Sequence, residues 1–337
     1  PDDSVPVTRF RWWSKAEPLG RFNTRNPVDA LRLANLFWRG TRALQELIRR
    51  ERADVVLACW AVPAGVFAES AKRATGTPYV TWSLGSDIHS SPKNPLLRPL
   101  VVRSLKHASK RYANAHVTAR EVERLCGIDC DILQTMRKLP DAVPADLPRD
   151  RRNFLFAGRF ERVKGADVLL SAFAKLDPQP VPPHLYLAGT GTEENALKAQ
   201  ARALNLENRV TFLGFLDGPA LASLLRAVDA VVIPSRAESL PTILTEAAQC
   251  GAPVIATRVG EVGAVLERFR IGLLVAPENS DGLARAMVEM MHLERDSFHA
   301  EQARLLHEFD LTRAAKKLAD DLEIIVTRPV RSRQDND

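Results

Sequence analysis

The sequence predicts an α/β protein with two domains, each built on a parallel sheet that helices cover. Three observations predict it. The chain has 337 residues, which is enough for two cores of ordinary size. From residue 153 onward, short apolar runs alternate with helical patterns, as in a parallel sheet covered on both faces. Residues 133–152 carry three prolines and dense charge without helical periodicity, which predicts an interdomain linker.

The expected domains follow from this division. The first covers residues 1–132 and the second residues 153–310. A final helix over residues 311–326 and a disordered tail over residues 327–337 are expected after them. Strands of the second domain are expected near residues 154–157, 184–188, 209–213, 229–233, 253–257 and 271–275, with helices between them.

One loop and the helix that follows it combine the features of an anion site. Thr242–Cys250 has a helical pattern, and Pro241 suits the first helical position. In a parallel sheet, the free backbone amides of Ser239, Thr242 and Ile243 then lie at a strand's carboxyl end and at a helix N-terminus. Anions bind at such places.

Two carboxylates accompany this loop. Glu238 lies in the loop itself, and Glu246 lies further along the helix. A carboxylate set back in this way suits a sugar diol, which needs paired acceptors. The alternative is that both acids are first-turn and surface residues that only tune the helix dipole.

Two cations follow a second strand end. A strand ends at Ala157 and Gly158, and Arg159 and Lys164 come before Gly165 opens another helix. Arg can grip a diphosphate by its fork and Lys by its point charge. The two loops occupy equivalent positions in one series of strands and helices. The alternative is two solvated loop cations.

The first half of the chain carries most of the positive charge. The net charge is +6, yet Arg9–Arg52 alone holds eleven Arg and Lys against four acids, and Leu97–Arg120 holds six against none. This asymmetry predicts a basic surface that faces an anionic partner, such as a membrane or a phosphorylated acceptor. A solvated basic face without a partner is the alternative.

Both basic stretches have apolar residues at helical spacing. Arg25–Arg52 is expected to be a helix that packs Trp38 and its leucines into the core, in preference to lying on a membrane. Leu97–Tyr112 is expected to be a second basic amphipathic helix and the better candidate for a membrane surface. Strands are expected over residues 1–13, 54–59 and 79–84, with a helix over residues 63–75.

The sequence argues against several classes of protein and site. No run of eighteen apolar residues occurs, and no signal-peptide pattern opens the chain. Four scattered cysteines do not make a disulfide framework, which favours a reducing cytosol. Asp129-Cys130-Asp131 lies at a helix exit far from the phosphate motifs, so we interpret it as a turn and not as a metal site. Nucleic-acid binding would rest on charge alone.

Four motifs in chain order resemble a known family. GR(x4)KG, LAGTG, RVTFLGF and ES(x)P(x4)E(x3)CG(x)PVIAT look like the donor half of retaining glycosyltransferases of GT-B architecture, family 4. The resemblance is dense over Asn153–Met291 and thinner before it. It implies two Rossmann-like domains facing each other across a cleft. It also implies a hexose transfer from a UDP- or GDP-sugar to a hydroxyl acceptor, with retention of configuration and with neither cofactor nor metal.

The resemblance also implies roles for individual residues. Arg159 and Lys164 would neutralise the leaving diphosphate, and Glu238 would contact the donor sugar. The amides after Glu238 would hold phosphate, Leu216 would offer backbone groups to the base, and Glu246 would take the ribose hydroxyls. The implied donor-binding set is Gly158, Leu216, Ser239, Leu240, Thr242, Ile243 and Glu246.

An acceptor-side segment is implied in the first domain. Gly85, Ser86 and Asp87 match a G-[ST]-D segment that borders the acceptor cleft in the family. Many members carry a His just before this glycine, where the present chain has Leu84. His89 could substitute for it only if the loop folds back. The other interpretation of Asp87 is that it caps the loop.

Parts of the chain depart from the family pattern. The usual opening strand, glycine-rich loop and helix have no counterpart, so the first domain is expected to lack its opening unit. Arg137-Lys138-Leu139-Pro140 stands where members often have an Asn-Gly turn. The alternatives to a transferase are therefore a non-catalytic GT-B scaffold or partner-binding subunit and, less favoured, a nucleotide-sugar epimerase. The final helix resembles one that crosses back to brace the first domain.

As a transferase, the protein is expected to be a cytoplasmic monomer that works at the inner face of the plasma membrane in cell-envelope polysaccharide synthesis. A lipid or a growing polysaccharide is the expected acceptor.

Overall fold

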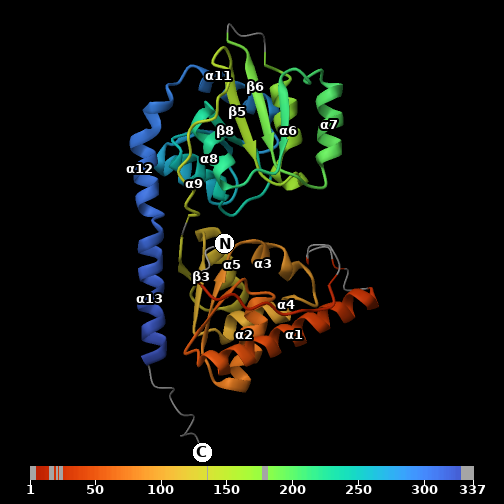
Figure 1. The fold of residues 1–337 in the computed structure, drawn as a ribbon, viewed down its shortest axis with the longest axis vertical. Helices are drawn as coiled ribbons and strands as arrows, with labels where there is room; N and C mark the ends of the chain where they lie inside the picture. Colours follow the sequence, from red (N-terminus) through yellow and green to blue (C-terminus); the bar gives the residue numbers. More distant parts are fainter. Residues whose placement is uncertain are drawn as a thin grey trace, which may run out of the picture. The chain divides into compact units, whose positions relative to one another are not determined.

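The computed structural model describes residues 5–14, 19, 22, 26–134, 136–176 and 181–327 (Figure 1). The chain divides into two compact units. Unit 1 comprises Pro1–Gln134 with Ala315–Asp337, and unit 2 comprises Thr135–Ala314. Each unit contains one parallel sheet, which confirms the predicted α/β class with two parallel sheets. The expected disordered tail lies outside the described residues except for Thr327, which ends the last helix.

Unit 1 has a four-stranded parallel sheet whose strands follow the chain order, β1-β2-β3-β4. The strands are β1 (Val56–Cys59), β2 (Tyr79–Ser83), β3 (Lys110–Ala113) and β4 (Asp131–Ile132). Its helices are α1 (Pro27–Glu51), α2 (Ala64–Thr75), α3 (Ser86–His89), α4 (Arg98–His107) and α5 (His116–Cys126), with the 3-10 turn η2 (Ser91–Lys93). Most of α13 (Leu311–Thr327) also belongs to this unit.

Unit 2 has a six-stranded parallel sheet in the order β10-β9-β8-β5-β6-β7. The strands are β5 (Arg152–Ala157), β6 (Pro183–Ala188), β7 (Val210–Gly214), β8 (Ala230–Ile233), β9 (Val254–Thr257) and β10 (Gly272–Val275). The helices are α6 (Ala166–Phe173), α7 (Glu194–Ala203), α8 (Gly218–Ala227), α9 (Thr242–Gln249), α10 (Val262–Phe269), α11 (Ser280–Met291) and α12 (His299–Glu308), with 3-10 turns η3 (Arg162–Lys164) and η4 (Arg295–Phe298). All six expected strands are confirmed.

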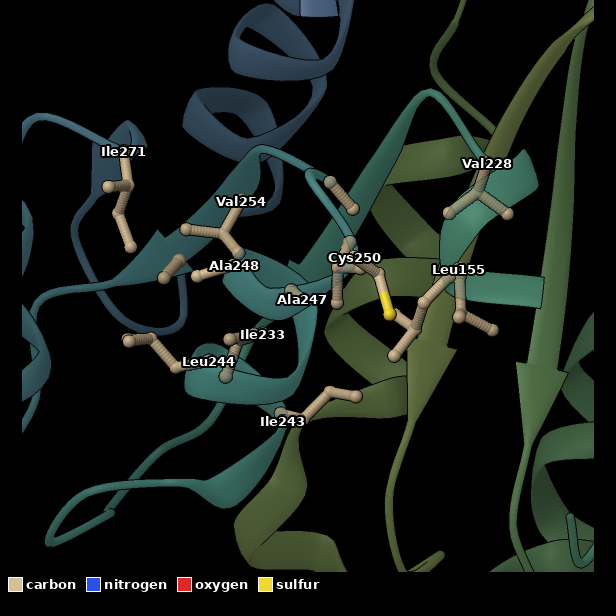
Figure 2. Close-up of a cluster of buried hydrophobic side chains, with 14 of the residues drawn as sticks. Leu155, Val228, Ile233, Ile243, Leu244, Ala247, Ala248, Cys250, Val254 and Ile271 are labelled. Atoms are coloured by element: carbon tan, nitrogen blue, oxygen red, sulfur yellow. The ribbon is translucent and has the colours of Figure 1, made fainter. Parts of the chain in front are cut away.

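The sheet of unit 2 is buried on both faces, which explains its continuous apolar strands. Along β5, Leu155 packs into one core with residues of α8, α9, α10 and α12, while Phe154 and Phe156 pack into the other with residues of α6, α7 and α11. Figure 2 shows the first core, where Leu244 and Ala247 of α9 lie among side chains of the strands. Helix α9 is therefore fixed against the sheet along its length.

Helix α1 forms as expected but does not bury all of the expected apolar stripe. Leu36 and Ile48 are buried, whereas Trp38 is 57% exposed and Leu31 is 60% exposed. The expectation that Trp38 packs into the core is therefore wrong. Apolar spacing alone did not decide which stripe of the helix meets α2, because exposed and buried apolar residues interleave along it.

The expected helix over Leu97–Tyr112 is also wrong at its C-terminal end. Helix α4 stops at His107, and Lys110–Ala113 is the strand β3 between β2 and β4. The backbone turns extended at Ala108 (φ −64°, ψ 140°), and Tyr112 is fully buried in the sheet. Tertiary burial of this aromatic side chain overrides the helical pattern.

The cations counted in that stretch are also not all free to form a basic surface. Arg111 is 8% exposed, and its guanidinium donates to the carbonyl oxygens of Leu105, Ala108 and Asp129 at 2.9, 3.0 and 3.2 Å. Arg103 donates to Glu69 Oε1 at 3.1 Å. A sequence count of charge therefore overstates the positive potential of this surface.

Two further expectations differ from the structure. The described residues 5–14 form no strand; Trp13 N instead donates to Asn35 Oδ1 of α1 at 2.8 Å. The expected linker lies almost wholly in unit 2, where Leu139 is 7% exposed in the core. Gln249 of α9 holds this segment by two hydrogen bonds, because its side-chain amide accepts from Leu139 N and donates to the carbonyl of Arg137.

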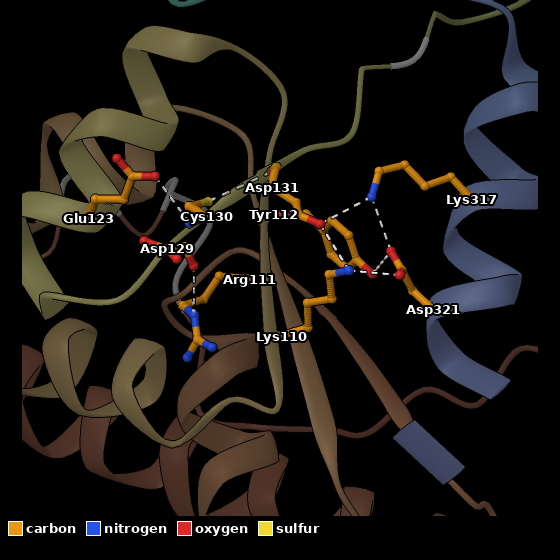
Figure 3. Close-up of polar contacts among 9 residues, drawn as sticks. All are labelled: Lys110, Arg111, Tyr112, Glu123, Asp129, Cys130, Asp131, Lys317 and Asp321. Atoms are coloured by element: carbon orange, nitrogen blue, oxygen red, sulfur yellow. Dashed lines mark hydrogen bonds and ion pairs between the residues drawn. The ribbon is translucent and has the colours of Figure 1, made fainter. Parts of the chain in front are cut away.

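Helix α13 is tied to the sheet of unit 1 by a charged cluster (Figure 3). The hydroxyl of Tyr112 donates to Asp321 Oδ2 at 2.8 Å. Lys110 Nζ lies 2.7 Å from Asp321 Oδ1 and 2.9 Å from Asp131 Oδ2, and Lys317 Nζ lies 3.1 Å from each of the two carboxylates. Burial raises the pKa of Asp321, but hydrogen bonds to Lys110, Tyr112 and Lys317 lower it to about 2.

We expect Asp321→Asn to destabilise unit 1 by about 1.5–3 kcal/mol, because Lys110 and Tyr112 lose a charged acceptor. A lowered folded-state pKa contributes stability above the ordinary aspartate pKa that is lost as pH falls through about 2. The difference between wild type and variant should therefore shrink between about pH 4 and about pH 2. Chemical unfolding over this range measures it.

The matched control for this variant is Asp320→Asn, because Asp320 is the neighbouring residue and is exposed. It should leave both the stability and its pH dependence unchanged. Equal stability of Asp321→Asn and wild type at neutral pH would contradict the anchoring role.

Candidate functional site

The carboxyl ends of the strands of unit 2 surround a pocket of about 480 Å³. From β5 the chain proceeds to β6 and β7 on one side, and then crosses to β8 on the other side of β5. Loops diverge where a parallel sheet reverses its order in this way, and open α/β sheets bind ligands at that point. Residues following β5, β6, β7 and β8 all line the pocket, and its volume suits a small molecule.

This pocket brings together nearly all the residues that the sequence predicted for the donor side. The predicted residues that line it are Gly158, Arg159, Lys164, Leu216, Glu238, Leu240, Thr242, Ile243 and Glu246. Ser239 is not among the lining residues, and its carbonyl accepts from Glu261 N at 2.9 Å. The individual roles of these residues stay predictions.

The cations and the loop carboxylate meet at one wall of the pocket. Lys164 Nζ forms an ion pair with Glu238 Oε2, and both side chains are largely buried. Ser235 Oγ lies 3.5 Å from the same carboxylate oxygen. Arg159 is exposed at the pocket lining. Because an ammonium has three N–H donors, Lys164 can hold Glu238 and still donate to an anion.

The start of helix α9 forms a second part of the lining. Pro241 is its N-cap, and Thr242 and Ile243 are its first two residues. The first amides of a helix have no partner within the helix, and the helix dipole adds positive potential there. This wall of the pocket is therefore suited to an anionic group.

Glu246 lies one turn further along α9 and is 4% exposed. Its Oε1 lies 2.8 Å from Arg137 Nε, and both residues line the pocket. Burial raises the pKa of Glu246 above its usual range, while the charge and hydrogen bond of Arg137 act in the opposite direction. The site thus contains a buried carboxylate whose recorded ion-pair partner comes from residues 133–152.

Arg236 joins the loops that carry Lys164 and Glu238. Its guanidinium donates to both carboxylate oxygens of Asp167 at 2.7 Å and to the carbonyl oxygen of Arg162 at 2.6 Å. Its backbone N–H donates to the carbonyl of Val163 at 2.8 Å, and its side chain also pairs with Glu278. A bidentate pair of this kind fixes geometry as well as charge, so it holds the η3 turn beside the loop after β8.

The matches to protein-family models agree with this geometry. Residues 141–305 match the model described as Glycosyl transferases group 1, and residues 24–114 match the model described as Glycosyl transferase 4-like. Together the two matches cover most of the chain. The chain belongs to the glycosyltransferases. Residues 141–305, which contain the pocket residues except Arg137, are its group 1 domain.

Several curated proteins are similar to this glycosyltransferase. The N-acetyl-alpha-D-glucosaminyl L-malate synthase of Bacillus anthracis is 27% identical over 261 residues, which are 74% of this chain and 68% of that protein. The D-inositol 3-phosphate glycosyltransferase of Arthrobacter sp. (strain FB24) is 33% identical over 153 residues, which are 44% of this chain and 36% of that protein. The chain thus spans between about a third and two thirds of these relatives.

Solved structures share the fold of the glycosyltransferase. Sucrose-phosphate synthase from Thermosynechococcus elongatus aligns with a TM-score of 0.76 at 21% identity, over 89% of this chain and 81% of that one. Anabaena Alr3699/HepE in complex with UDP-glucose aligns with a TM-score of 0.72 at 21% identity, over 89% and 84%. At this identity the likeness shows the fold, which is that of GT-B glycosyltransferases.

In unit 1 of the glycosyltransferase, Gly85, Ser86, Asp87 and His89 lie at and just after the carboxyl end of β2. Asp87 is 3% exposed, and its carboxylate accepts from the backbone N–H groups of Ala61, Leu84 and Gly85 at 2.8, 3.2 and 3.1 Å. These bonds fit the loop-capping interpretation, and an acceptor role stays a prediction. His89 is exposed, and its Nε2 lies 3.4 Å from Thr118 Oγ1.

The glycosyltransferase also uses two arginines that sequence reasoning did not assign to the site. Arg137 was interpreted as part of a linker, and the charge of that segment hid its contact with Glu246. Arg236 directly follows Ser235 in the motif around Glu238, and this position in the sequence was the available signal. Both contacts join segments far apart in the chain, and local pattern does not predict such pairs.

The part of the chain that the structure describes shows neither a metal cluster nor a helix that could span a membrane. Those residues include no group of three or more His, Cys, Asp or Glu that could hold a metal ion. In the triplet at residues 129–131, Asp131 pairs with Lys110 and Lys317. None of the described helices has the length and apolarity needed to cross a membrane.

Gly165 fixes the approach of the η3 turn to β8. Its φ is +70°, and a Cβ there would lie 2.0 Å from the carbonyl oxygen of Pro234. Only glycine fits such an approach without a backbone shift. Lys164 is the preceding residue, so this contact places its side chain at the pocket.

We expect Gly165→Ala to destabilise unit 2 more than Gly214→Ala does. Gly214 has nearly the same φ, +68°, but no atom lies within 4 Å of its Cβ position. The control should therefore lose about 1–2 kcal/mol of stability, which is the cost of a left-handed backbone at alanine. Gly165→Ala should lose about 1–3 kcal/mol more, because the added Cβ also meets Pro234. Urea unfolding of both variants measures the difference. Equal losses would show that the Pro234 contact does not constrain the loop.

Proposed function

We propose that this glycosyltransferase moves a hexose from a nucleotide-sugar to a hydroxyl acceptor and retains the anomeric configuration. The observation that carries the proposal is one pocket that combines Arg159, the Lys164–Glu238 pair, the start of α9 and the buried Glu246. A diphosphate, a sugar and a ribose diol each find a complementary group there. A UDP- or GDP-sugar is the proposed co-substrate, without a further cofactor.

The diphosphate is placed between the cations and the start of α9. Arg159 and Lys164 supply positive charge from the β5 side, and Thr242 and Ile243 supply amides from the β8 side. Gly158 and Leu240 allow the ligand to approach the loops, Leu216 faces the base, and Glu246 accepts from the ribose hydroxyls. Glu238, held by Lys164, contacts the transferred sugar. The UDP-glucose complex of the structural neighbour Alr3699/HepE supports a donor of this class.

Catalysis in this proposal is mainly electrostatic. Negative charge builds on the leaving diphosphate as the glycosidic bond breaks, and preorganised cations with a helix N-terminus stabilise that charge. The acceptor hydroxyl enters on the face that the leaving group departs from, which gives retention. Because these groups supply the positive charge, the proposal assigns no step to a metal.

The acceptor in this proposal is a lipid-linked or polysaccharide hydroxyl, bound by a monomer at the cytoplasmic face of the plasma membrane during cell-envelope synthesis. Exposed arginines of α1, Arg39, Arg42 and Arg49, support an anionic surface as partner. The cations of β3 do not contribute, because Lys110 and Arg111 are bound within unit 1.

Nucleotide binding tests the donor site directly. In calorimetric titrations of the chain with UDP, GDP and ADP, we expect one nucleotide to bind with a Kd on the order of micromolar. Glu246→Ala should weaken that binding by about tenfold or more, because the ribose loses a charged acceptor. Glu267→Ala, which removes an exposed carboxylate of the same unit, is the control. If none of the three nucleotides binds, the donor site is refuted and a non-catalytic scaffold is favoured.

Arg159→Ala should lower turnover with the preferred donor by more than about tenfold, since one charge-stabilising donor commonly contributes at least that much. The matched control is Arg162→Ala, because Arg162 is an exposed arginine three residues later that does not line the pocket. Initial rates of nucleotide release measure both variants. Wild-type rates in Arg159→Ala would rule out its role at the leaving group.

A further inference from the structure

Arg137 is held at the pocket by its own backbone. Its carbonyl accepts from Gln249 Nε2 at 2.8 Å, and Gln249 Oε1 accepts from Leu139 N at 3.1 Å. Leu139 is buried in the core of unit 2. Gln249 lies three residues after Glu246 on α9, so one helix fixes both the backbone and the side chain of this arginine.

The ion pair between Arg137 and Glu246 joins a solvent-exposed guanidinium to a buried carboxylate. The side chain of Arg137 is 54% exposed and that of Glu246 is 5% exposed. Arg137 Nε lies 2.8 Å from Glu246 Oε1. Each oxygen of an ionised carboxylate can accept hydrogen bonds from two donors. Glu246 can therefore keep its ion pair with Arg137 and still accept from a bound diol.

Other charged groups around α9 are engaged elsewhere. Arg226 of α8 pairs with Asp141, and Arg295 of η4 donates to the carbonyl oxygens of Gly251 and Val228. Glu246 also acts electrostatically on Cys250 at the end of α9. Across the pocket, Lys164 pairs with Glu238. Among the described residues, the salt bridge of Glu246 is therefore with Arg137.

We propose that Arg137 is a positioning residue that keeps Glu246 ionised and oriented for the ribose hydroxyls, and so sets the lower pH limit of nucleotide binding. The inference rests on the proposed function, because it takes Glu246 as the ribose acceptor. It goes beyond that function because it assigns to Arg137, in the segment before β5, an effect on the pH dependence of nucleotide binding.

The electrostatics support this role. Burial disfavours the charged form of Glu246 and raises its pKa, and Arg137 opposes that effect by its charge and its hydrogen bond. Removing Arg137 leaves burial alone, so the carboxyl should bind a proton at a higher pH than in wild type. A protonated carboxyl gives the diol weaker hydrogen bonds than a carboxylate does. Nucleotide affinity is then present above the pKa of Glu246 and lost as pH falls through it.

Calorimetric titrations test the inference. The full chain is titrated with the nucleoside diphosphate that binds wild type, over about pH 5.5 to about pH 8.5. Arg137→Gln should bind about tenfold more weakly than wild type at the acidic end of this range and recover toward wild type at the basic end. Arg137→Lys, which keeps a cation, should follow the wild-type profile more closely. Glu246→Gln should remove the pH dependence in either background. A purely structural role would weaken binding equally at every pH.

A second measurement separates this inference from the proposed function. The pKa of Glu246, followed by carboxyl carbon NMR without any nucleotide, should rise in Arg137→Gln. An unchanged pKa overturns the inference even if nucleotide binds, and absent nucleotide binding by wild type overturns the proposed function instead. Tighter binding by Arg137→Gln would also overturn the inference, because Arg137 would then compete with the ribose. Matching thermal unfolding of the variants excludes a folding defect.

Discussion

Unit 2 depends on one topological constraint, the reversal of strand order between β5 and β8. Because all strands are parallel, their carboxyl ends meet at one edge of the sheet, and the reversal spreads the loops of neighbouring strands apart. Every feature of the pocket uses this opening. The cations follow β5, the glycine turn follows β6, and the carboxylate loop with the start of α9 follows β8. Burial of both faces of the sheet holds these loops to a rigid frame.

Within that frame, paired charges position the loops. Arg236 ties the loop after β8 to the η3 turn through the carbonyl of Arg162 and to α6 through Asp167, and Lys164 of that turn pairs with Glu238. Arg137 likewise pairs with Glu246, and both residues line the pocket. Partly buried pairs of this kind contribute little net stability but are costly to break, because one buried charge would remain unpaired. Their effect is to fix the geometry of charged groups before a ligand arrives, and preorganised charge of this kind stabilises a leaving group well.

Unit 1 uses its charges differently. Lys110, Tyr112, Asp131, Lys317 and Asp321 form a closed cluster between β3, β4 and α13, and Arg111 satisfies three backbone carbonyls. These residues look like surface cations and acids in the sequence, yet they serve the attachment of a helix to a sheet. Exposed positive charge remains on both helices, at Arg39 and Arg49 of α1 and at Arg98 and Lys106 of α4.

The sequence by itself determined the parallel α/β class, the six strands of unit 2 and most of the pocket residues, because strand burial, glycine turns and helix starts leave local patterns. The family resemblance added the identity of the chemistry. Only the tertiary structure decided that Lys110–Ala113 is a strand, that Trp38 faces solvent, and that Arg137 reaches Glu246. The physical reason is that each of these depends on what a side chain meets far away in the sequence. Hydrophobic spacing and charge counts indicate which local structures and contacts a residue permits. Burial against residues distant in the sequence decides which of them forms.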